Sequence, residues 1–457
     1  MRHFDWRSLV VSSMLVASLA AHAETRPQYG GTLRIVMRAS PASLDPEDAA
    51  QPDSFGRRSL TALIFDTLVT TDENARPQPS LAASWQTSPG GRRWQFRIRR
   101  GVSFHDGTAL NGEMVAASLR VANPSWTVSV DGDSVVIERA GSDAELLAEL
   151  ALPRNAIAKR NADNTLSGTG PFKVADWQPG KKLALAADEN CWHGRPFLDA
   201  IEIEMGKSFR DQMTALELGK ADLAEVAPEQ THHMSQEGRR VASSVPVELL
   251  ALVFTRDAAS PGEKLLREAL AHSVERSSIR SVLLQGAGQP AGGILPNWMS
   301  GYGFVFPTDA DLPQARQARE RVRVVPTWTL GYDAVDAMVR LVAERIALNA
   351  RDAGLSLQPS AAANADLRFV RIPLASPDPW IALAGVAALA GAPGIEKTGT
   401  VDDLYASEVA LLSTRRVIPL FHLPVSYAAS ATLNHWSVRP DGSWTVADAW
   451  LGTNRDR

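Results

Sequence analysis

Apolar positions recur along the chain with two different periods, and the two kinds of segment alternate. Residues 94–98 alternate apolar and polar side chains, which predicts a half-buried strand. Residues 126–130 and 134–137 flank Asp131-Gly132-Asp133, a composition that predicts a β-hairpin. Residues 33–37 form a further short strand pattern after a glycine pair.

Helical spacing is equally clear elsewhere. We expect Asn111 to cap a helix that runs to Leu119, and a second helix over 264–275. The longest helix is expected from about Asp333 to Arg351. Its apolar stripe consists of Val335, Met338, Val339, Val342 and Ile346. Strands and helices that alternate in this way are typical of α/β architecture.

Length and composition narrow the class of protein. The chain has 457 residues, which is more than one hydrophobic core usually supports, so we expect two or three lobes. A formal net charge of −4 gives no basic excess for a nucleic-acid surface. The single cysteine, Cys191, excludes an internal disulfide and a cysteine-based metal cluster.

The first 23 residues have the pattern of a secretory signal peptide. Two arginines precede an uncharged stretch over 9–21, and Ala21-His22-Ala23 supplies an A-x-A site, so we expect cleavage after Ala23. The alternative is a membrane anchor, but 13 helical residues rise only about 20 Å. Residues 379–395 are also uncharged, but they are rich in alanine and glycine and predict a buried helix followed by a loop. The mature protein is expected to be soluble, periplasmic and not membrane-spanning.

The sequence carries no pattern of catalytic or metal chemistry. The nine histidines are scattered, and the adjacent His232 and His233 would point in different directions on a helix or a strand. No HExxH, P-loop or GxSxG motif is present. We therefore assign no catalytic residue, no metal ligand and no cofactor.

An ordered series of segments carries the most specific signal. The series is YGGTLRI (29–35), SLDP (43–46), PSLAASWQTSPGGRRWQFRIRRGVSFHDGTALNGEMVAASL (79–119), SGTGPFKVADW (167–177), ALELGKADL (215–223) and LREALAHSVERSSI (266–279). In this order the segments resemble the extracytoplasmic solute-binding proteins of family 5, which serve peptide, nickel and opine ABC importers. Beyond residue 279 the resemblance weakens, with IPLFHLP (418–424) as a later trace.

The resemblance implies an α/β, two-lobed periplasmic-binding-protein type II fold, with an extra subdomain inserted in the first lobe. We expect residues 1–23 to be the signal peptide and 51–167 the inserted subdomain. Lobe I would comprise 24–50, 168–246 and 425–457, and lobe II would comprise 247–424.

The resemblance also implies candidate ligand contacts. Arg154, in LALPR, matches an arginine that holds a carboxylate in nickel-type relatives, although a surface arginine after a proline turn is an equal alternative. Peptide receptors carry an aspartate ahead of a PDP-like turn, where this chain has Ala375. Asp378 in that turn and Trp380 beside it are the remaining candidates there. Thr255 stands where the family has an asparagine in its second lobe.

Two further tryptophans, Trp126 and Trp298, are expected in the core. The missing aspartate places the binding of a free peptide amine in doubt, because a charge-assisted hydrogen bond worth roughly 1.5–3 kcal/mol would be lost.

The function expected from the resemblance is that of the periplasmic substrate-binding component of an ABC importer. It would capture a small organic solute, peptide-like or otherwise anionic, and deliver it to an inner-membrane permease as a monomer, without enzymatic chemistry. The alternatives are a ligand-sensing receptor for a membrane signalling partner, or a diverged binding protein with a degraded cleft.

Overall fold

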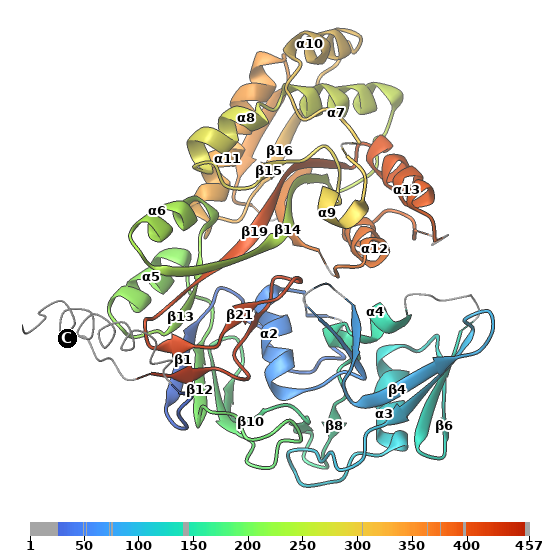
Figure 1. Cartoon of the computed structure of the whole chain (residues 1–457). Helices are drawn as coiled ribbons and strands as arrows, with labels where there is room; N and C mark the ends of the chain where they lie inside the picture. Colours follow the sequence, from blue (N-terminus) through green and yellow to red (C-terminus); the bar gives the residue numbers. More distant parts are fainter. Residues whose placement is uncertain are drawn as a thin grey trace, which may run out of the picture.

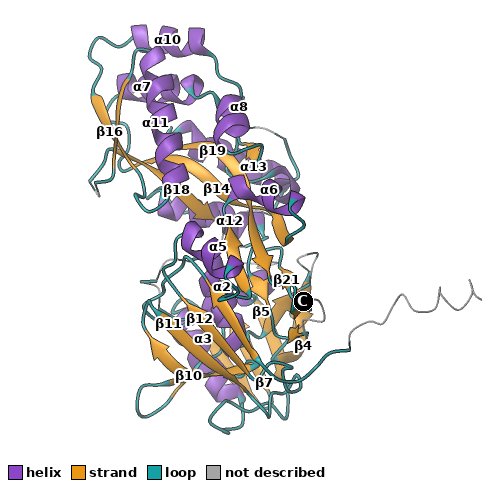
Figure 2. Cartoon of the chain, turned by 90° about the vertical axis from the view of Figure 1, so that its left-hand side faces the viewer, coloured by secondary structure: helices purple, strands orange, loops and turns teal. Residues whose placement is uncertain are grey.

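The computed structural model describes residues 26–452 apart from 49, 52, 73, 75, 140–145, 304, 363, 375 and 396–398. The predicted signal peptide and Ala375 therefore lie outside the described residues. Two α/β bodies, lobe I and lobe II, are joined by the long strands β14 (Arg240–Phe254) and β19 (Val417–Ala429), which run antiparallel from one body into the other (Figures 1 and 2).

One mixed sheet of eleven strands extends through both lobes. Lobe I contributes, in order, β10 (Phe172–Gln178), β11 (Lys182–Ala187), β12 (Ala200–Glu204), β1 (Thr32–Val36) and β13 (Leu223–Val226), next to β19. Lobe II contributes β18 (Leu367–Pro373), β16 (Thr327–Gly331) and β17 (Ser356–Ser360) next to β14, with β15 (Gln289–Pro290) paired to β19.

The strand directions decide where the two lobes face each other. β1 is parallel to β12 and β13, and β13 is antiparallel to β19, so the carboxyl ends of these strands point toward lobe II. β18 is antiparallel to β14 and parallel to β16, so the carboxyl ends of β16 and β18 point toward lobe I. The carboxyl ends of parallel strands from both lobes therefore meet at the junction, which is where open α/β sheets bind ligands.

The crossing strands are irregular at this junction. Pro246 of β14 lies opposite Pro424 of β19, and the register shifts on both sides of Pro246. Because proline has no backbone N–H to donate, the ladder is weakened where the chain passes between the lobes.

Both faces of the lobe II sheet are buried, as the alternation along β14 requires. Leu250, Leu252 and Phe254 face one core, whereas Leu249 and Val253 face the other. The first core is covered by α7 (Pro261–Ser273), α10 (Leu312–Glu320) and α11 (Ala337–Asp352). The second is covered by α9 (Asn297–Ser300), α12 (Pro379–Leu389) and α13 (Val401–Ser413), on the right of Figure 1.

An antiparallel sheet of four strands forms a separate unit beside lobe I. Its order is β4 (Ala82–Thr87), β5 (Arg93–Ile98), β7 (Ser134–Glu138) and β6 (Thr127–Asp131), and α3 (Gly112–Ala122) packs against it in a core of its own. Helix α2 (Phe55–Ile64) falls inside the range predicted for the inserted subdomain, but its Leu60 and Leu63 belong to the core of lobe I.

The remaining elements are short or lie at the edges of the lobes. They are β2 (Val69–Thr71), β3 (Pro77–Pro79), α4 (Leu146–Leu150), η1 (Pro153–Asn155), β8 (Lys159–Arg160), β9 (Leu166–Ser167), α5 (Phe209–Glu217), η2 (Pro228–Gln230), α6 (Thr231–Gln236), α8 (Arg276–Ser278), η3 (Ile279–Leu283), β20 (Leu433–Asn434), β21 (Ser437–Val438), β22 (Trp444–Thr445) and β23 (Trp450–Leu451).

Most predicted elements are present, with several displaced boundaries: α7 begins at Pro261 instead of residue 264, and α3 ends at Ala122 instead of Leu119. The hairpin β6–β7 is confirmed, and Asn111 caps α3 by accepting from the N–H of Met114 at 3.0 Å. The long helix was expected from Asp333 but begins at Ala337, because Asp336 accepts from the N–H groups of Met338 and Val339 and caps the helix there. Val335, predicted in its apolar stripe, is consequently 76% exposed, and that prediction is wrong.

The uncharged stretch over 379–395 forms the buried helix α12 followed by a loop, as predicted. Over the described part of the chain, no helix combines the length and apolarity that crossing a bilayer requires.

Candidate functional site

A buried arginine joins the two lobes at the carboxyl ends of their strands. Arg58 on α2 is 2% exposed. Its guanidinium donates to the carboxylate of Asp53 (Nε–Oδ1 3.0 Å), to the carbonyl oxygen of Asp441 (2.7 Å) and to the carbonyl oxygen of Leu374 in lobe II (2.8 Å). The desolvation of Arg58 is offset by the negative charge of Asp53, so its pKa stays above the ordinary value. The contacts hold α2, the loop after β21 and the segment after β18 in one place.

A polar cavity of about 90 Å³ opens beside this arginine, and we call it the α2 cavity. It lies where α2, the segment around η1 and the turn between β21 and β22 meet. It is lined by Arg58, Thr61, Ala62, Phe65, Asp66, Thr67, Thr70, Ser80, Ala151, Pro153, Ala156, Arg439 and Asp441.

Two of the four predicted site residues lie on segments that border this region. Arg154 directly follows Pro153 of the cavity wall; its side chain is 49% exposed and pairs with Glu149 at 3.1 Å. Asp378 lies four residues after Leu374, and its carboxylate accepts from the N–H groups of Trp380 and Ile381 and so caps α12.

The other two predicted residues have structural surroundings of their own. Trp380 is 7% exposed and packs in the second core of lobe II. Thr255 lies beyond the far end of β14, roughly 30 Å of strand from Pro246, and its hydroxyl donates to the carbonyl oxygen of Asp366 at 3.0 Å. The structure does not bring Thr255 together with Arg154 or Asp378.

One aromatic residue at the junction was placed wrongly from the sequence. Trp298 on α9 was expected in the core but is 41% exposed, and its Nε1 donates to the carbonyl oxygen of Pro246 at 2.8 Å. Trp126, by contrast, is buried as predicted. The turn of the α2 cavity reaches the same part of β14, because a Cβ added to Gly442 would lie 2.9 Å from Val247 Cγ2. Trp298 and the cavity therefore flank one point of the crossing strand.

A cluster of charges joins the lobes on the opposite face of the sheet. Arg371 on β18 pairs with Glu248 on β14 (Nη2–Oε2 2.6 Å) and with Asp336 at the start of α11 (3.1 Å). Arg38, after β1 of lobe I, reaches the same Asp336 carboxylate at 3.3 Å. Burial lowers the pKa of Arg371, but the attraction of the two carboxylates outweighs burial and raises it.

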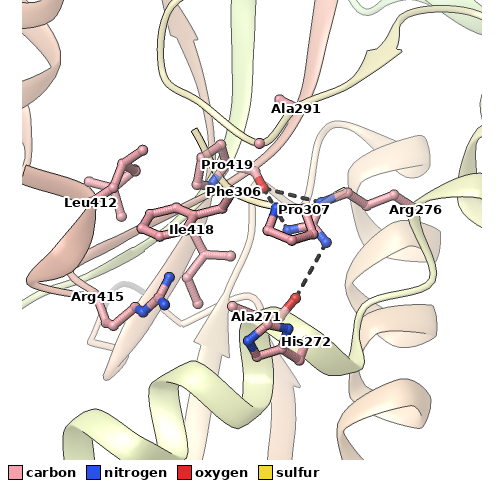
Figure 3. Close-up of a pocket in the computed structure, with 12 residues that line it drawn as sticks. Ala271, His272, Arg276, Ala291, Phe306, Pro307, Leu412, Arg415, Ile418 and Pro419 are labelled. Carbon is pink, nitrogen blue, oxygen red and sulfur yellow. Dashed lines mark hydrogen bonds between the residues drawn. The ribbon is translucent and has the colours of Figure 1, made fainter. Parts of the chain in front are cut away.

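Two further cavities differ from the α2 cavity in size and lining. A groove of about 470 Å³, the α6 groove, lies between α6 of lobe I and residues 285–287 of lobe II, over Pro424. The third, inside lobe II, has about 30 Å³, room for one water molecule (Figure 3). Arg276 at its wall already donates to the carbonyl oxygen of Pro419 at 2.9 Å, so this small cavity has no room for an organic solute.

No cluster of three or more histidine, cysteine, aspartate or glutamate side chains suited to a metal ion occurs in the described ranges. The fold and the junction together define a class, the type II periplasmic binding proteins: two α/β lobes joined by two strands, with opposed carboxyl ends.

Comparison with known proteins specifies the family. Residues 76–366 match the model of the bacterial extracellular solute-binding proteins, family 5, middle region, and the chain belongs to this family.

Among curated relatives, the nickel-binding protein NikA of Staphylococcus aureus is 24% identical over 277 residues, covering 57% of this chain and 55% of NikA. The oligopeptide-binding protein AppA of Bacillus subtilis is 24% identical over 331 residues, covering 65% of this chain and 59% of AppA. The chain thus spans between half and two thirds of the length of these relatives.

Solved structures show the same fold over nearly the whole chain. NikA of Staphylococcus aureus in complex with Ni(L-His)2 has a TM-score of 0.81 at 17% identity, covering 92% of this chain and 100% of that one. A Pseudoalteromonas dipeptide-binding protein in complex with Met-Leu has a TM-score of 0.81 at 16% identity, with the same coverage.

Proposed function

We propose that this protein is the substrate-binding component of an ABC importer, which captures a small organic solute between its lobes and delivers it to an inner-membrane permease. The observation that carries the proposal is the junction: carboxyl ends of strands from two lobes oppose each other, and two strands weakened at Pro246 and Pro424 connect them. Such a connection suits hinge closure around a ligand, which shifts the population toward the closed state. The relatives named for nickel and oligopeptide binding support the same role.

The location and organisation follow from the sequence patterns. We place the protein in the periplasm after cleavage behind Ala23, acting as a monomer. We also place the lobe boundaries at the facing prolines, with lobe II over 247–424. Capture requires no chemistry, and the binding energy would come from burial of the solute and a few polar anchors.

The solute is proposed to be peptide-like or otherwise anionic. Arg154 borders the α2 cavity and could rotate from Glu149 to a ligand carboxylate, since an exposed ion pair is worth only about 0–1 kcal/mol. Trp298 is better placed than Trp380 as an aromatic wall, because it is exposed at the junction. An Arg154→Ala variant should bind an anionic cargo about tenfold or more weakly, as titration calorimetry would measure. Unchanged affinity would remove Arg154 from the site.

The test of the function is native mass spectrometry of the protein purified from a periplasm, before and after denaturing desalting. A discrete excess mass that disappears on denaturation would identify a captured cargo. A bare mass, followed by no thermal stabilisation with peptides, chelated nickel or sugars, would contradict the proposal and favour the degraded cleft. A cargo bound by a protein without a cognate permease would favour the sensing role.

A further inference from the structure

The α2 cavity contains a cation whose hydrogen-bonding capacity the protein does not use. Arg439 lines the cavity and is partly buried, yet its guanidinium has no hydrogen bond or ion pair within the described part of the chain. Arg58, the second cation of the cavity, is instead occupied by Asp53 and two backbone carbonyl oxygens. The spare donors of the cavity therefore belong to Arg439.

Two carboxylates in the wall of the same cavity each accept hydrogen bonds through one oxygen only, among the described residues. Asp66 accepts through Oδ2 from the Thr169 hydroxyl (2.8 Å) and from Trp192 Nε1 (3.0 Å). Asp441 accepts through Oδ1 from the backbone N–H and the hydroxyl of Ser443 (3.0 and 2.6 Å). No donor among the described residues reaches the other oxygen of either group. These hydrogen bonds fix the orientation of the carboxylates and leave one oxygen of each available.

The charges discriminate between ligands. Because Asp53 compensates Arg58, an anion in the cavity would meet the carboxylates of Asp66 and Asp441, and a cation would meet Arg439. A ligand group with one positive and one negative charge can pair its anion with Arg439 and its cation with Asp66 and Asp441. The available volume of about 90 Å³ corresponds to roughly three water molecules at about 30 Å³ each, so only a head group of a few heavy atoms fits.

We propose that the α2 cavity binds a compact zwitterionic head group, the α-ammonium and carboxylate end of an amino-acid-type solute. The carboxylate lies on Arg439, the ammonium lies on Asp66 and Asp441, and the rest of the solute extends out of the cavity. The proposal rests on the proposed function and names the chemical class of its cargo. It also provides an amine partner in place of the aspartate that this chain lacks at Ala375, because Asp66 and Asp441 supply the carboxylates.

The test begins with the unaltered protein. Pools of the twenty L-amino acids are screened by thermal shift, and the best probe is titrated by calorimetry beside its N-acetyl and methyl-ester derivatives. We expect each derivative to bind about 10- to 100-fold more weakly than the free amino acid, since each lacks one charge-assisted contact. A derivative that binds as well as the parent compound would overturn the assignment.

Variants then separate the two ends of the head group. Arg439→Gln should weaken binding of the free amino acid about tenfold or more but leave the affinity for the methyl ester unchanged. Asp66→Asn should also weaken binding of the free amino acid but leave the affinity for the N-acetyl form unchanged. Arg100→Gln, whose side chain is 87% exposed and pairs with Asp133, is the matched control and should change neither. Circular dichroism establishes that each variant is folded, and the comparison of derivatives on the unaltered protein needs no variant.

The outcomes distinguish this inference from the function on which it rests. If mass spectrometry releases a cargo without a zwitterionic head group, the inference fails and the transport role stands. If no cargo is released and no probe binds, both fail.

Discussion

The charge cluster behind the junction allows a quantitative prediction. Glu248 is the nearest partner of Arg371, and their side chains are 5% and 18% exposed. Glu248→Gln keeps the shape and an acceptor oxygen but removes the negative charge, so Arg371 keeps one carboxylate partner among those described above, Asp336 at 3.1 Å. Loss of one member of a buried pair costs about 3–5 kcal/mol. Because Asp336 still pairs with Arg371, we expect a loss of stability at the lower end, about 3 kcal/mol.

Thermal unfolding measures this cost. At about 2–4 °C per kcal/mol for a lobe of this size, Tm should fall by roughly 6–12 °C. The matched control is Glu202→Gln, whose carboxylate pairs with Lys182 at 3.4 Å with both side chains 40% or more exposed, and it should shift Tm by less than about 2 °C. A Glu248→Gln protein that melts within about 2 °C of the parent would refute the reasoning. Glu248→Leu combined with Arg371→Met should be less destabilising than the single change, because the buried pair is removed as a whole and Asp336 keeps its contact to Arg38 at 3.3 Å.

Two further predictions concern buried positions. Burial lowers the pKa of His422 to about 4, and its ring lies 2.9 Å from the carbonyl oxygen of Ile294. The folded state holds the neutral ring, so the contribution of His422 to the free energy of unfolding is complete above the unfolded pKa of about 6.5 and decreases by about 3 kcal/mol as the pH falls toward 4. Urea unfolding from pH 7 to 4 should show this loss. His422→Gln should remove that part of the dependence of stability on pH. A Cβ at Gly168 would lie 1.8 Å from the Ile64 carbonyl oxygen, so Gly168→Ala should lower the free energy of unfolding by about 3 kcal/mol or more. Gly303→Ala is the control and should be neutral, because no atom lies within 4 Å of its added Cβ. Equal urea midpoints for the two variants would contradict this packing.

The elements could be predicted wherever one local rule acted alone. The β6–β7 hairpin follows from alternation around a turn, and α3 begins where Asn111 can cap it. The start of α11 was misplaced because the Asp336 cap prevails over an apolar residue, Val335, that happened to continue the helical period. Trp298 was misplaced because α9 has only four residues, too few to show a periodicity.

The candidate site could be predicted only in part, because it is assembled from distant segments. The hydrogen bond from Arg58 to Asp441 spans 383 residues. The sequence Arg439-Pro440-Asp441-Gly442 is a strong turn signal and could have located the β21–β22 hairpin. Nothing local indicates that this turn lies against α2, and the family resemblance implies ligand contacts only at Arg154, Thr255 and the turn before α12.

The most direct test of the whole account is hydrogen–deuterium exchange of the protein with and without the cargo that native mass spectrometry identifies. Increased protection is expected in α2, in residues 439–442 and at the start of α12, because the solute would bind at the α2 cavity and bring lobe II against it. Protection confined to the α6 groove, or no change in either lobe, would contradict it.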